Sequence, residues 1–327
     1  MDMNIITISK EHPDIAVWEI KELLKIKNLN QIDRYILTAS LNKKLLDRLG
    51  YSKQAFKVIF SCKPKEIINR IKEYKLNNLI KKSYKIKHYN IKKEIQEEIN
   101  SAVWHKLKNP KVKMKNPFHE LGFIKLNQKI YFCMKIWENT EDFDSRLPHK
   151  RIGLRPISLK PRFARALVNL SGCRKGTIVD PMTGTSGILI EALLCGLKAE
   201  GYDINEIFLR ISDLNLKKYG GNYSLQVKNF FALRKKINYI VSDLPYGKNT
   251  KSLDMDFYKK VAEKLKQILV KRAIIIFPST CFPEKLITQA NLKLIKKFTI
   301  FIHNSMSRIV CIIENPNHKK LNKLNNK

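Results

Sequence analysis

Acidic residues are scarce in this chain. Its 327 residues include 29 aspartates and glutamates against 63 lysines and arginines, which gives a formal net charge of +34. Such an excess of one sign repels itself, and an extended polyanion is the partner that relieves it best. Composition therefore predicts a nucleic-acid partner and leaves an anionic membrane surface as the alternative. The 44% of apolar residues is enough for packed cores, which excludes wholesale disorder.

Three further absences narrow the class of protein. No apolar run approaches the roughly 18 residues of a membrane span, and Met1–Lys10 lacks the basic start and apolar core of a signal peptide. The six cysteines are scattered without C-x-x-C spacing, so neither a metal site nor a disulfide framework is expected. A reducing cytoplasm is the predicted location. The sequence indicates neither an oligomeric state nor an accessory subunit.

The first half of the chain alternates short strands with helices. Strands are expected at Asn4–Ser9, Tyr35–Ala39 and Ala55–Phe60, and helices at Pro13–Leu24 and Lys43–Leu49. This order predicts a small α+β sandwich. In a second unit, helices are expected at Pro64–Tyr74 and Ile91–Leu107, and strands at Tyr84–His88, Lys111–Lys115 and Gly122–Lys135.

The pattern changes after a polar, irregular linker. Helices and strands alternate from Arg162 to Phe277, which predicts a parallel, doubly wound sheet. Leu294–His303 and Arg308–Glu314 are expected to form a hairpin, so that the last strand runs antiparallel. A parallel sheet with a terminal hairpin is the arrangement of class I, Rossmann-like methyltransferases, and the predicted fold class is α/β.

The segment from Asp180 to Gly187 joins a predicted strand to a predicted helix. In open α/β sheets, ligands bind at the carboxyl ends of the strands. Gly184 and Gly187 permit tight backbone geometry and close approach to a ligand. The helix start, at Thr185 and Ser186, offers N–H groups to a carboxylate such as the methionine end of S-adenosylmethionine. By itself the segment is equally typical of an ordinary strand-to-helix turn.

Asp203 ends the next predicted strand. An acidic side chain there can accept both hydroxyls of a ribose, and the spacing of about 20 residues from the first loop suits that role. The competing interpretation is an N-cap for the helix that starts near Asn205.

A third element, Asp243-Leu244-Pro245-Tyr246, follows the fourth predicted strand. It resembles the Asp/Asn-Pro-Pro-Tyr/Phe motif of amino-group methyltransferases. An exocyclic base nitrogen is a poor nucleophile because its lone pair is delocalised. Acceptors at Asp243 and at the carbonyl of Leu244 would pull the nitrogen towards a pyramidal form and aim its lone pair at the methyl group. Pro245 fixes the turn, and Tyr246 offers a face for stacking on an extruded base.

Two other chemistries fit the sequence less well. A C5-pyrimidine methyltransferase needs a nucleophilic cysteine near the base. Cys281 follows the fifth strand, but the sequence identifies no general base for it, so a structural role is predicted. A hydride-transferring enzyme would prefer G-x-G-x-x-G in the first loop, where this motif is absent.

Taken together, these elements resemble a known family, the archaeal-type tRNA guanine-10 N2-methyltransferases, which carry an N-terminal THUMP domain. The run from Ser158 to Ala166, Ser-Leu-Lys-Pro-Arg-Phe-Ala-Arg-Ala, is the most specific match. Pro148-His149-Lys150-Arg151 and Lys113–Lys135 also resemble the family. The resemblance implies S-adenosylmethionine as cofactor and Ser158 among the residues that bind it. It also implies that the THUMP module grips the acceptor end of tRNA.

Four residues depart from the family pattern. Leu244 stands where the family has a proline, but its backbone carbonyl can still accept a hydrogen bond. Thr183 and Ser186 replace a cysteine and a glycine, and Ser186 costs about 1 kcal/mol if its position needs a positive φ. Asn229, at the third strand end, replaces an acidic residue that faces the adenine of the cofactor.

We therefore expect a ferredoxin-like domain at residues 1–62, a THUMP RNA-binding domain at 63–138, a linker at 139–157, a methyltransferase domain at 158–316 and a basic tail at 317–327. The leading hypothesis is an enzyme that methylates the N2 amino group of a guanine in tRNA. The first alternative is an N6-adenine or N4-cytosine methyltransferase acting on DNA or another RNA, and the second is a non-catalytic RNA-binding protein. The basic first half favours structured RNA, and the three aspartates argue against the second alternative.

Overall fold

The computed structural model describes residues 3–153, 158–245, 255–303 and 306–317. The chain forms two compact units that are not consecutive halves of the sequence. Unit 1 consists of residues 1–13, 26–47 and 51–140, and unit 2 consists of residues 14–25, 48–50 and 141–327. Each unit contains a seven-stranded sheet.

The sheet of unit 1 is mostly antiparallel. Its strands are β1 (Asn4–Ile8), β2 (Asn30–Ile32), β3 (Tyr35–Thr38), β4 (Ser52–Cys62), β5 (Tyr84–Tyr89), β6 (His119–Leu126) and β7 (Lys129–Glu138). Across the sheet they lie in the order β2-β3-β1-β4-β7-β6-β5, and β5 and β6 are parallel. Strand β4 pairs with β1 on one side and with β7 on the other. The sheet is therefore continuous across residue 62, where the sequence predicts a domain boundary.

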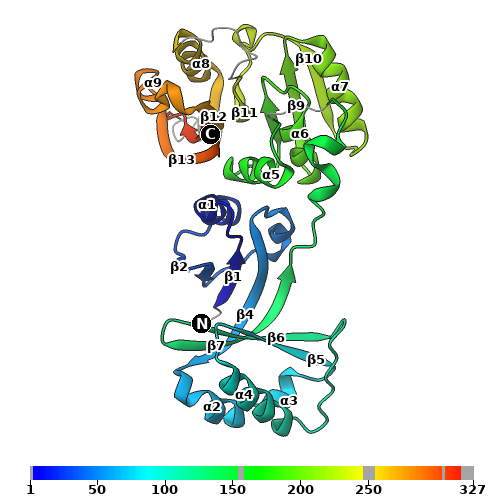
Figure 1. Ribbon diagram of the computed structural model, residues 1–327. Helices are drawn as coiled ribbons and strands as arrows, with labels where there is room; N and C mark the ends of the chain where they lie inside the picture. Colours follow the sequence, from blue (N-terminus) through cyan, green and yellow to red (C-terminus); the bar gives the residue numbers. More distant parts are fainter. Residues whose placement is uncertain (1–2, 154–157, 246–254, 304–305, 318–327) are drawn as a thin grey trace, which may run out of the picture. The chain divides into compact units, whose positions relative to one another are not determined.

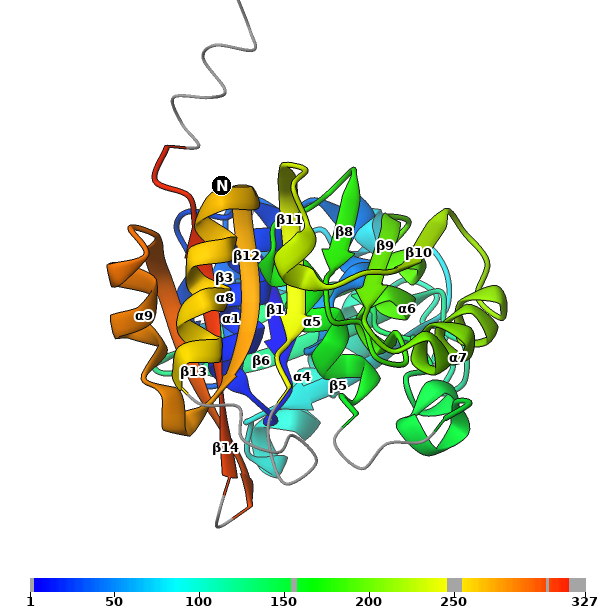
Figure 2. The ribbon, with the colours of Figure 1, turned by 90° about the horizontal axis from the view of Figure 1, so that it is seen from above.

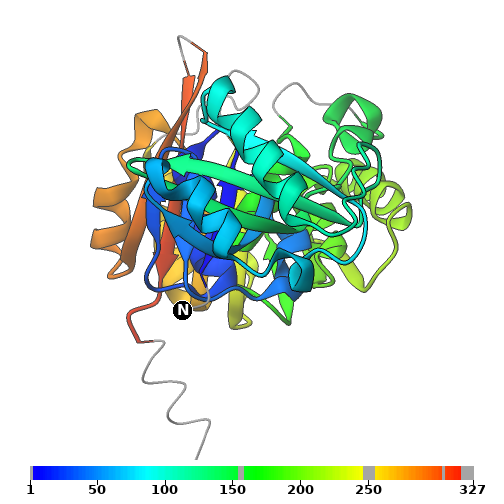
Figure 3. The ribbon, with the colours of Figure 1, turned by 90° about the horizontal axis from the view of Figure 1, so that it is seen from below.

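Short helices cover one face of this sheet (Figures 1 and 3). They are α2 (Ile67–Glu73), α3 (Leu76–Leu79) and α4 (Lys93–Lys106). Helix α4 buries Ile99 and Val103, which are four residues apart and so lie on one face of the helix. These side chains pack in one apolar cluster with Phe123 and Phe132 of the sheet.

The sheet of unit 2 is parallel along most of its width. Its strands are β8 (Thr177–Asp180), β9 (Lys198–Asp203), β10 (Tyr223–Val227), β11 (Ile237–Asp243), β12 (Leu269–Pro278), β13 (Lys293–His303) and β14 (Met306–Glu314). Their order is β10-β9-β8-β11-β12-β14-β13 (Figure 2). The first four neighbouring pairs are parallel, whereas β14 runs antiparallel to both β12 and β13. The predicted parallel sheet with an antiparallel terminal strand is confirmed.

The α-helices that accompany this sheet in the described part of unit 2 are α1 (Pro13–Leu24), α5 (Pro161–Leu170), α6 (Gly187–Leu194), α7 (Glu206–Lys217), α8 (Met255–Ile268) and α9 (Pro283–Gln289). Proline stands at the first position of α5, where its missing N–H is not needed. The side chain of Asn205 caps α7 by accepting hydrogen bonds from the N–H groups of Ile207 and Phe208.

Helix α1 comes from the start of the chain but belongs to unit 2. Its Glu19 is fully buried, and Glu19 Oε1 accepts hydrogen bonds from Asn169 Nδ2 and from the N–H of Gly50, each at 2.7 Å. Asn169 Nδ2 also donates to the carbonyl of Arg48 at 2.7 Å, and Arg48 Nη2 donates to Asn169 Oδ1 at 3.2 Å. Two short N-terminal segments are thus bonded into unit 2 through Asn169.

The structure differs from the local predictions at a few places. Lys111–Lys115 is not a strand: only the bridge between Tyr84 and Val112 connects it to β5, and Val112 and Met114 are exposed. The short helix predicted at Lys43–Leu49 is present as a 3₁₀ helix, Lys43–Arg48. Helix α9 was not predicted. No helix of the described residues combines the length and the apolar character that crossing a membrane requires.

Candidate active site

A cavity of about 670 Å³ opens in unit 2 where β8, β9 and β11 end. Ten of the twelve residues predicted for the site line it: Ser158, Asp180, Gly184, Thr185, Gly187, Asp203, Asn229, Asp243, Leu244 and Pro245. Ser186 is fully buried and is not part of the lining. Tyr246 lies outside the described residues. The parallel strands bring these residues together because their carboxyl ends meet at one edge of the sheet.

Asp180 ends β8 and is almost completely buried. Its Oδ1 accepts hydrogen bonds from the hydroxyl of Ser242 at 2.7 Å and from the N–H of Met182 at 3.2 Å. Burial raises the pKa of Asp180 to about 7, and the nearby carboxylates of Asp243 and Asp203 add to this rise. Asp180 therefore connects β8 to β11 and shapes the loop that follows it.

The loop after Asp180 adopts the left-handed backbone conformation twice. Gly184 has a φ of 52° and Ser186 a φ of 65°. The position of Ser186 thus needs the positive φ at which a side chain is strained by about 1 kcal/mol. The hydroxyl of Ser186 lies 3.1 Å from that of Thr183, and it does not cap α6. The N-terminus of α6 therefore begins at the cavity without a side-chain cap.

Asp203 ends β9 and is held by two backbone donors. The N–H of Gly184 donates to Asp203 Oδ2 and the N–H of Asn205 donates to Oδ1, each at 2.9 Å. The cap of α7 is Asn205, so the competing interpretation of Asp203 as that cap is wrong. Each carboxylate oxygen has a second lone pair, which leaves acceptor capacity towards the cavity.

Asp243 ends β11, and Arg308 of β14 lies beside it. Arg308 is buried, and its Nη2 is 3.7 Å from Asp243 Oδ2. The next two residues are anchored: the N–H of Leu244 donates to the carbonyl of Ile276 at 3.1 Å, and the hydroxyl of Tyr258 donates to the carbonyl of Pro245 at 3.0 Å. A proline at position 244 would lose the bond to Ile276.

Asn229, which the sequence predicted, lies in the lining, and its side chain accepts a hydrogen bond from the N–H of Phe231 at 2.9 Å.

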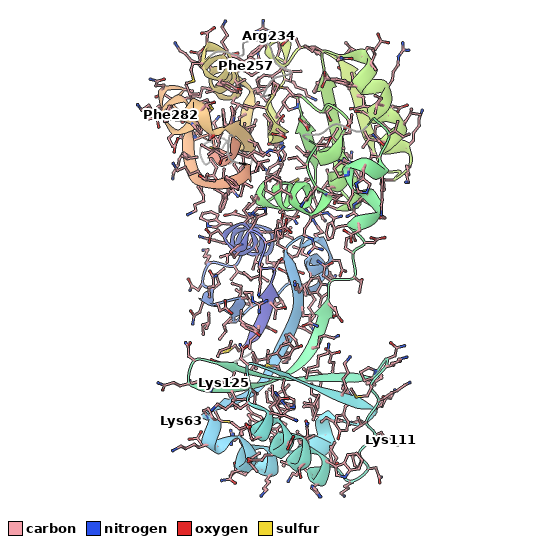
Figure 4. The ribbon with its side chains drawn as sticks, viewed as in Figure 1. Lys63, Lys111, Lys125, Arg234, Phe257 and Phe282 are labelled. Carbon is pink, nitrogen blue, oxygen red and sulfur yellow. The ribbon has the colours of Figure 1, made fainter. Side chains whose placement is uncertain are left out.

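Several other residues of the lining were not predicted from the sequence. Ile204, Phe231 and Phe257 add apolar surface that was not predicted, and Figure 4 labels Phe257 on α8. Ile204 directly follows Asp203 and is 72% exposed, so an apolar residue at a strand end was the available signal.

Cys281 does not have the properties of a nucleophile. Its side chain is buried, and its Sγ donates to the carbonyl of Pro278 at 3.2 Å. Burial raises the pKa of Cys281 to about 12, so that the side chain is a thiol at neutral pH. These properties fit the predicted structural role.

Known proteins resemble this chain along most of its length. Residues 148–308 match a family model described as RMKL-like, methyltransferase domain. The tRNA (guanine(10)-N2)-dimethyltransferase of Pyrococcus abyssi is 30% identical over 92% of this chain and 96% of its own length. The protein of the same name from Methanocaldococcus jannaschii is 27% identical with the same coverage.

Solved structures share the fold. TrmN from Thermus thermophilus superposes with a TM-score of 0.53 and 15% identity, covering 95% of this chain and 99% of its own. The putative methyltransferase SMU.472, crystallised with S-adenosylhomocysteine, gives a TM-score of 0.51 and 13% identity, with 95% and 98% covered. At these identities the likeness shows the fold, which is that of Rossmann-like methyltransferases.

Proposed function

This chain belongs to the tRNA (guanine(10)-N2)-dimethyltransferase family, and we propose that it methylates the N2 amino group of guanine 10 in tRNA with S-adenosylmethionine as the methyl donor. One observation carries the proposal: the carboxylate of Asp243 lies in the same cavity as Asp203 and the start of α6. The cavity thus contains an acceptor for the guanine amino group, Asp243, together with two groups that suit S-adenosylmethionine: Asp203 for its ribose and the start of α6 for its carboxylate.

The residues of the cavity fit this cofactor. The carboxylate of Asp203 is held in place by two N–H groups and retains acceptor capacity for ribose hydroxyls. Ile204 and Phe231 offer apolar faces to a planar base. The uncapped N-terminus of α6 suits a carboxylate. When bound, S-adenosylmethionine supplies a methyl group on a positively charged sulfur.

Asp243 is the proposed catalytic residue. Its carboxylate accepts a hydrogen bond from the guanine amino group, and the carbonyl of Leu244 accepts the second, which localises the nitrogen lone pair. One N–C bond forms, one S–C bond breaks with its electron pair left on sulfur, and one amino proton leaves through the carboxylate of Asp243. Arg308 offsets the negative charge of Asp243. Tyr246, by its place in the motif, is proposed to stack on the base.

Unit 1 is proposed to bind the tRNA. The proposed THUMP module, residues 63–138, lies in unit 1, whereas the proposed ferredoxin-like module, residues 1–62, contributes residues 14–25 and 48–50 to unit 2. Lys111, Lys113 and Lys115 are exposed in one short segment, and Figure 4 marks Lys111 together with Lys63 and Lys125 of unit 1. Exposed lysines of this kind contact phosphates. The linker at 139–157 and the catalytic domain at 158–316 complete the proposed organisation.

Single-turnover methylation of a tRNA transcript tests the role of Asp243. Asp243→Ala should lower the rate by at least about 10²-fold, the usual scale for losing one preorganised electrostatic partner. Asp243→Asn keeps one acceptor oxygen and should retain more activity than Asp243→Ala. Asp144→Ala, which removes an exposed carboxylate of unit 2, is the matched control. A parental rate in Asp243→Ala would show that the active site is placed wrongly.

A second transcript tests the substrate. Inosine in place of guanine 10 removes only the N2 amino group, so methylation should disappear. Methylation that persists on the inosine transcript would contradict the N2 assignment and favour another exocyclic amine. Mass spectrometry of the nucleosides identifies the product in both transcripts.

A further inference from the structure

Three arginines lie close together in the part of unit 2 that leads into the cavity, but only two of them are neutralised. Glu191 of α6 accepts hydrogen bonds from Arg146, at 2.6 Å from Nε and 3.1 Å from Nη2, and from Arg165 Nε at 2.8 Å. Glu141 Oε1 lies 2.7 Å from Arg146 Nη2 and 3.4 Å from Arg165 Nη2. Two carboxylates thus pair with two guanidinium groups, and the third, Arg151, adds a surplus positive charge.

Arg151 lines the cavity. Its Nη2 donates to the carbonyl of Leu159 at 3.2 Å. Within the described part of the chain, no carboxylate lies at ion-pair distance from Arg151. Its Nη1 stands 2.7 Å from the point where a Cβ on Gly187 would be. The guanidinium group therefore lies directly against the first residue of α6, and the absence of a side chain at Gly187 makes room for it.

Two positively charged groups, the start of α6 and the guanidinium group of Arg151, therefore lie next to each other. The N-terminus of a helix carries a partial positive charge, and α6 has no side-chain cap to offset it. A guanidinium group beside it, partly removed from water, lacks a countercharge in this part of the cavity. An anion between the guanidinium and the helix start would stabilise both groups at once.

The remaining charges of the cavity define the kind of anion. Asp180, Asp203 and Asp243 line the same cavity. Three acidic side chains disfavour a polyanion such as an RNA backbone, which would meet them as well as the arginine. A ligand with one carboxylate and separate positive groups matches both ends of the cavity. An amino acid with a positively charged sulfur has this distribution of charge.

We infer that Arg151 binds the α-carboxylate at the methionine end of the cofactor, and that it selects cofactors that carry an aminocarboxypropyl group. The inference rests on the proposed function and adds to it a residue outside the loop after β8 and the strand ends. Arg151 precedes Gly187 by 36 positions in the sequence. A bidentate guanidinium–carboxylate pair is the arrangement that arginine favours.

Calorimetry with two ligands tests the inference. S-adenosylhomocysteine carries the carboxylate, whereas 5′-methylthioadenosine lacks the whole amino-acid end. Arg151→Gln should weaken binding of S-adenosylhomocysteine by about 10- to 100-fold, the scale of one charge-assisted hydrogen-bond pair. Binding of 5′-methylthioadenosine should stay within about twofold of the parental value, because the nucleoside contacts are elsewhere. Arg151→Lys should fall between the parental chain and Arg151→Gln.

Lys150→Gln is the matched control, because it removes an exposed positive charge from the neighbouring position and should change neither affinity. Equal losses for both ligands in Arg151→Gln, or no loss for either, would overturn the inference. A loss of tRNA binding without a loss of S-adenosylhomocysteine binding would overturn it in favour of a phosphate contact. If the parental chain binds neither ligand, the proposed function fails, which is a separate result.

Discussion

Glu120 of unit 1 and Asp180 of unit 2 are both buried acids, and they differ in their partners. Glu120 of unit 1 lies 2.9–3.0 Å from the ammonium groups of Lys85, Lys87 and Lys135. Burial by itself raises the pKa of Glu120, but the three lysines outweigh it and hold the pKa at about 2. Asp180 of unit 2 receives two neutral donors and lies near other carboxylates, so burial raises its pKa to about 7.

We propose that this difference separates a structural role for Glu120 from a functional role for Asp180. In unit 1 a single carboxylate holds three lysines of neighbouring strands in place, which stabilises a basic surface. In unit 2 three aspartates line one cavity, whose described lining also includes the basic residue Arg151. Such an arrangement is unfavourable in the absence of a ligand, and groups of this kind concentrate at functional sites.

The largest expected effect concerns tRNA binding, which we assign to unit 1. If about 6–10 phosphates are contacted, the affinity should fall by about 10³–10⁵ between 50 and 200 mM salt. The slope of the logarithm of the binding constant against the logarithm of the salt concentration counts the phosphate contacts. Replacing Lys111, Lys113 and Lys115 together by glutamine should reduce the magnitude of this salt slope by about 3, one for each contact. Fluorescence anisotropy of labelled tRNA measures both quantities.

The matched control for that prediction lies in unit 2. Replacing Lys175, Lys198 and Lys259, which are also exposed, removes the same charge and should change the slope by less than about 1. If the unit 2 triple variant loses more affinity than the unit 1 variant, the assignment of tRNA binding to unit 1 is wrong.

The second prediction concerns Asn169, which bonds the N-terminal segments into unit 2. Asn169→Ala leaves buried polar groups of Glu19 and Arg48 without this partner and should lower the free energy of unfolding of unit 2 by about 2–3 kcal/mol. Asn77 of unit 1 also bonds two backbone groups, of Lys106 and Lys108, but is exposed. Asn77→Ala should therefore change the stability of unit 1 by less than about 1 kcal/mol.

Tryptophan fluorescence separates the two units in this experiment. Trp18 lies in unit 2, whereas Trp104 and Trp137 lie in unit 1, and the chain has three tryptophans. Urea unfolding followed by Trp18 alone, in a chain with the other two replaced by phenylalanine, reports unit 2. Equal effects of the two asparagine substitutions would show that burial does not distinguish them.

The third prediction is a pH dependence of opposite sign in the two units. The pKa of Glu120 is lower in the folded chain than its unfolded value of about 4.3. Its carboxylate therefore stabilises the folded unit 1 above about pH 4.3, and this stabilisation is lost as the pH falls towards about 2. The pKa of Asp180 is higher in the folded chain than its unfolded value of about 3.9, so the stability of unit 2 decreases as the pH rises from about 3.9 towards about 7.

Substitutions isolate the two groups. Asp180→Asn keeps the acceptor oxygen for Met182 and Ser242 and should make unit 2 more stable at pH 8 than the parental chain, by an amount on the order of 1 kcal/mol or more. Glu120→Gln should make unit 1 less stable at pH 7. It should also reduce the amount of stability that unit 1 loses as the pH falls. Urea midpoints across the pH range measure both, and a parental pH profile in Asp180→Asn would contradict the raised pKa.

The smallest expected effect compares two residues with positive φ. Ser186→Gly removes the strain of a side chain in the left-handed region and should stabilise unit 2 by up to about 1 kcal/mol, less what the lost contact with Thr183 contributes. Asn127, in the turn between β6 and β7, has a φ of 51°, but asparagine tolerates this region. Asn127→Gly should therefore gain less, as thermal unfolding can show.

The sequence allowed most of the parallel sheet of unit 2, and most of the residues that line its cavity, to be predicted, because the ends of parallel strands carry recognisable residues. Asp180, Asp203 and Asp243 each follow an apolar strand, and the structure places them at one cavity. Lys111–Lys115 was predicted wrongly because its alternation suggests a buried face, whereas Val112 and Met114 are exposed. Alternation shows that a segment can form a strand, but not that another strand covers it.

Long-range packing accounts for what the sequence did not reveal. Helix α1 was predicted with its correct bounds, yet no local pattern assigns it to unit 2, because Asn169 is 150 positions from Glu19. Arg151 was noted only as part of a family-like run, since its position against Gly187 depends on how the linker returns to α6. Three-dimensional contacts of this kind have no periodicity in the sequence.

The strand order β12-β14-β13 has a consequence for synthesis on the ribosome. Strand β13 is synthesised before β14, but its only partner in the described part of the sheet is β14. Strand β13 therefore stays unpaired until residues 306–314 have emerged from the ribosome. Its lysines, Lys293, Lys296 and Lys297, oppose association with other nascent chains during that wait. Because Arg308 arrives with β14, the surroundings of Asp243 are completed only when this strand inserts. We therefore expect a nascent chain stalled before β14 to fold unit 1 but to have no methyltransferase activity.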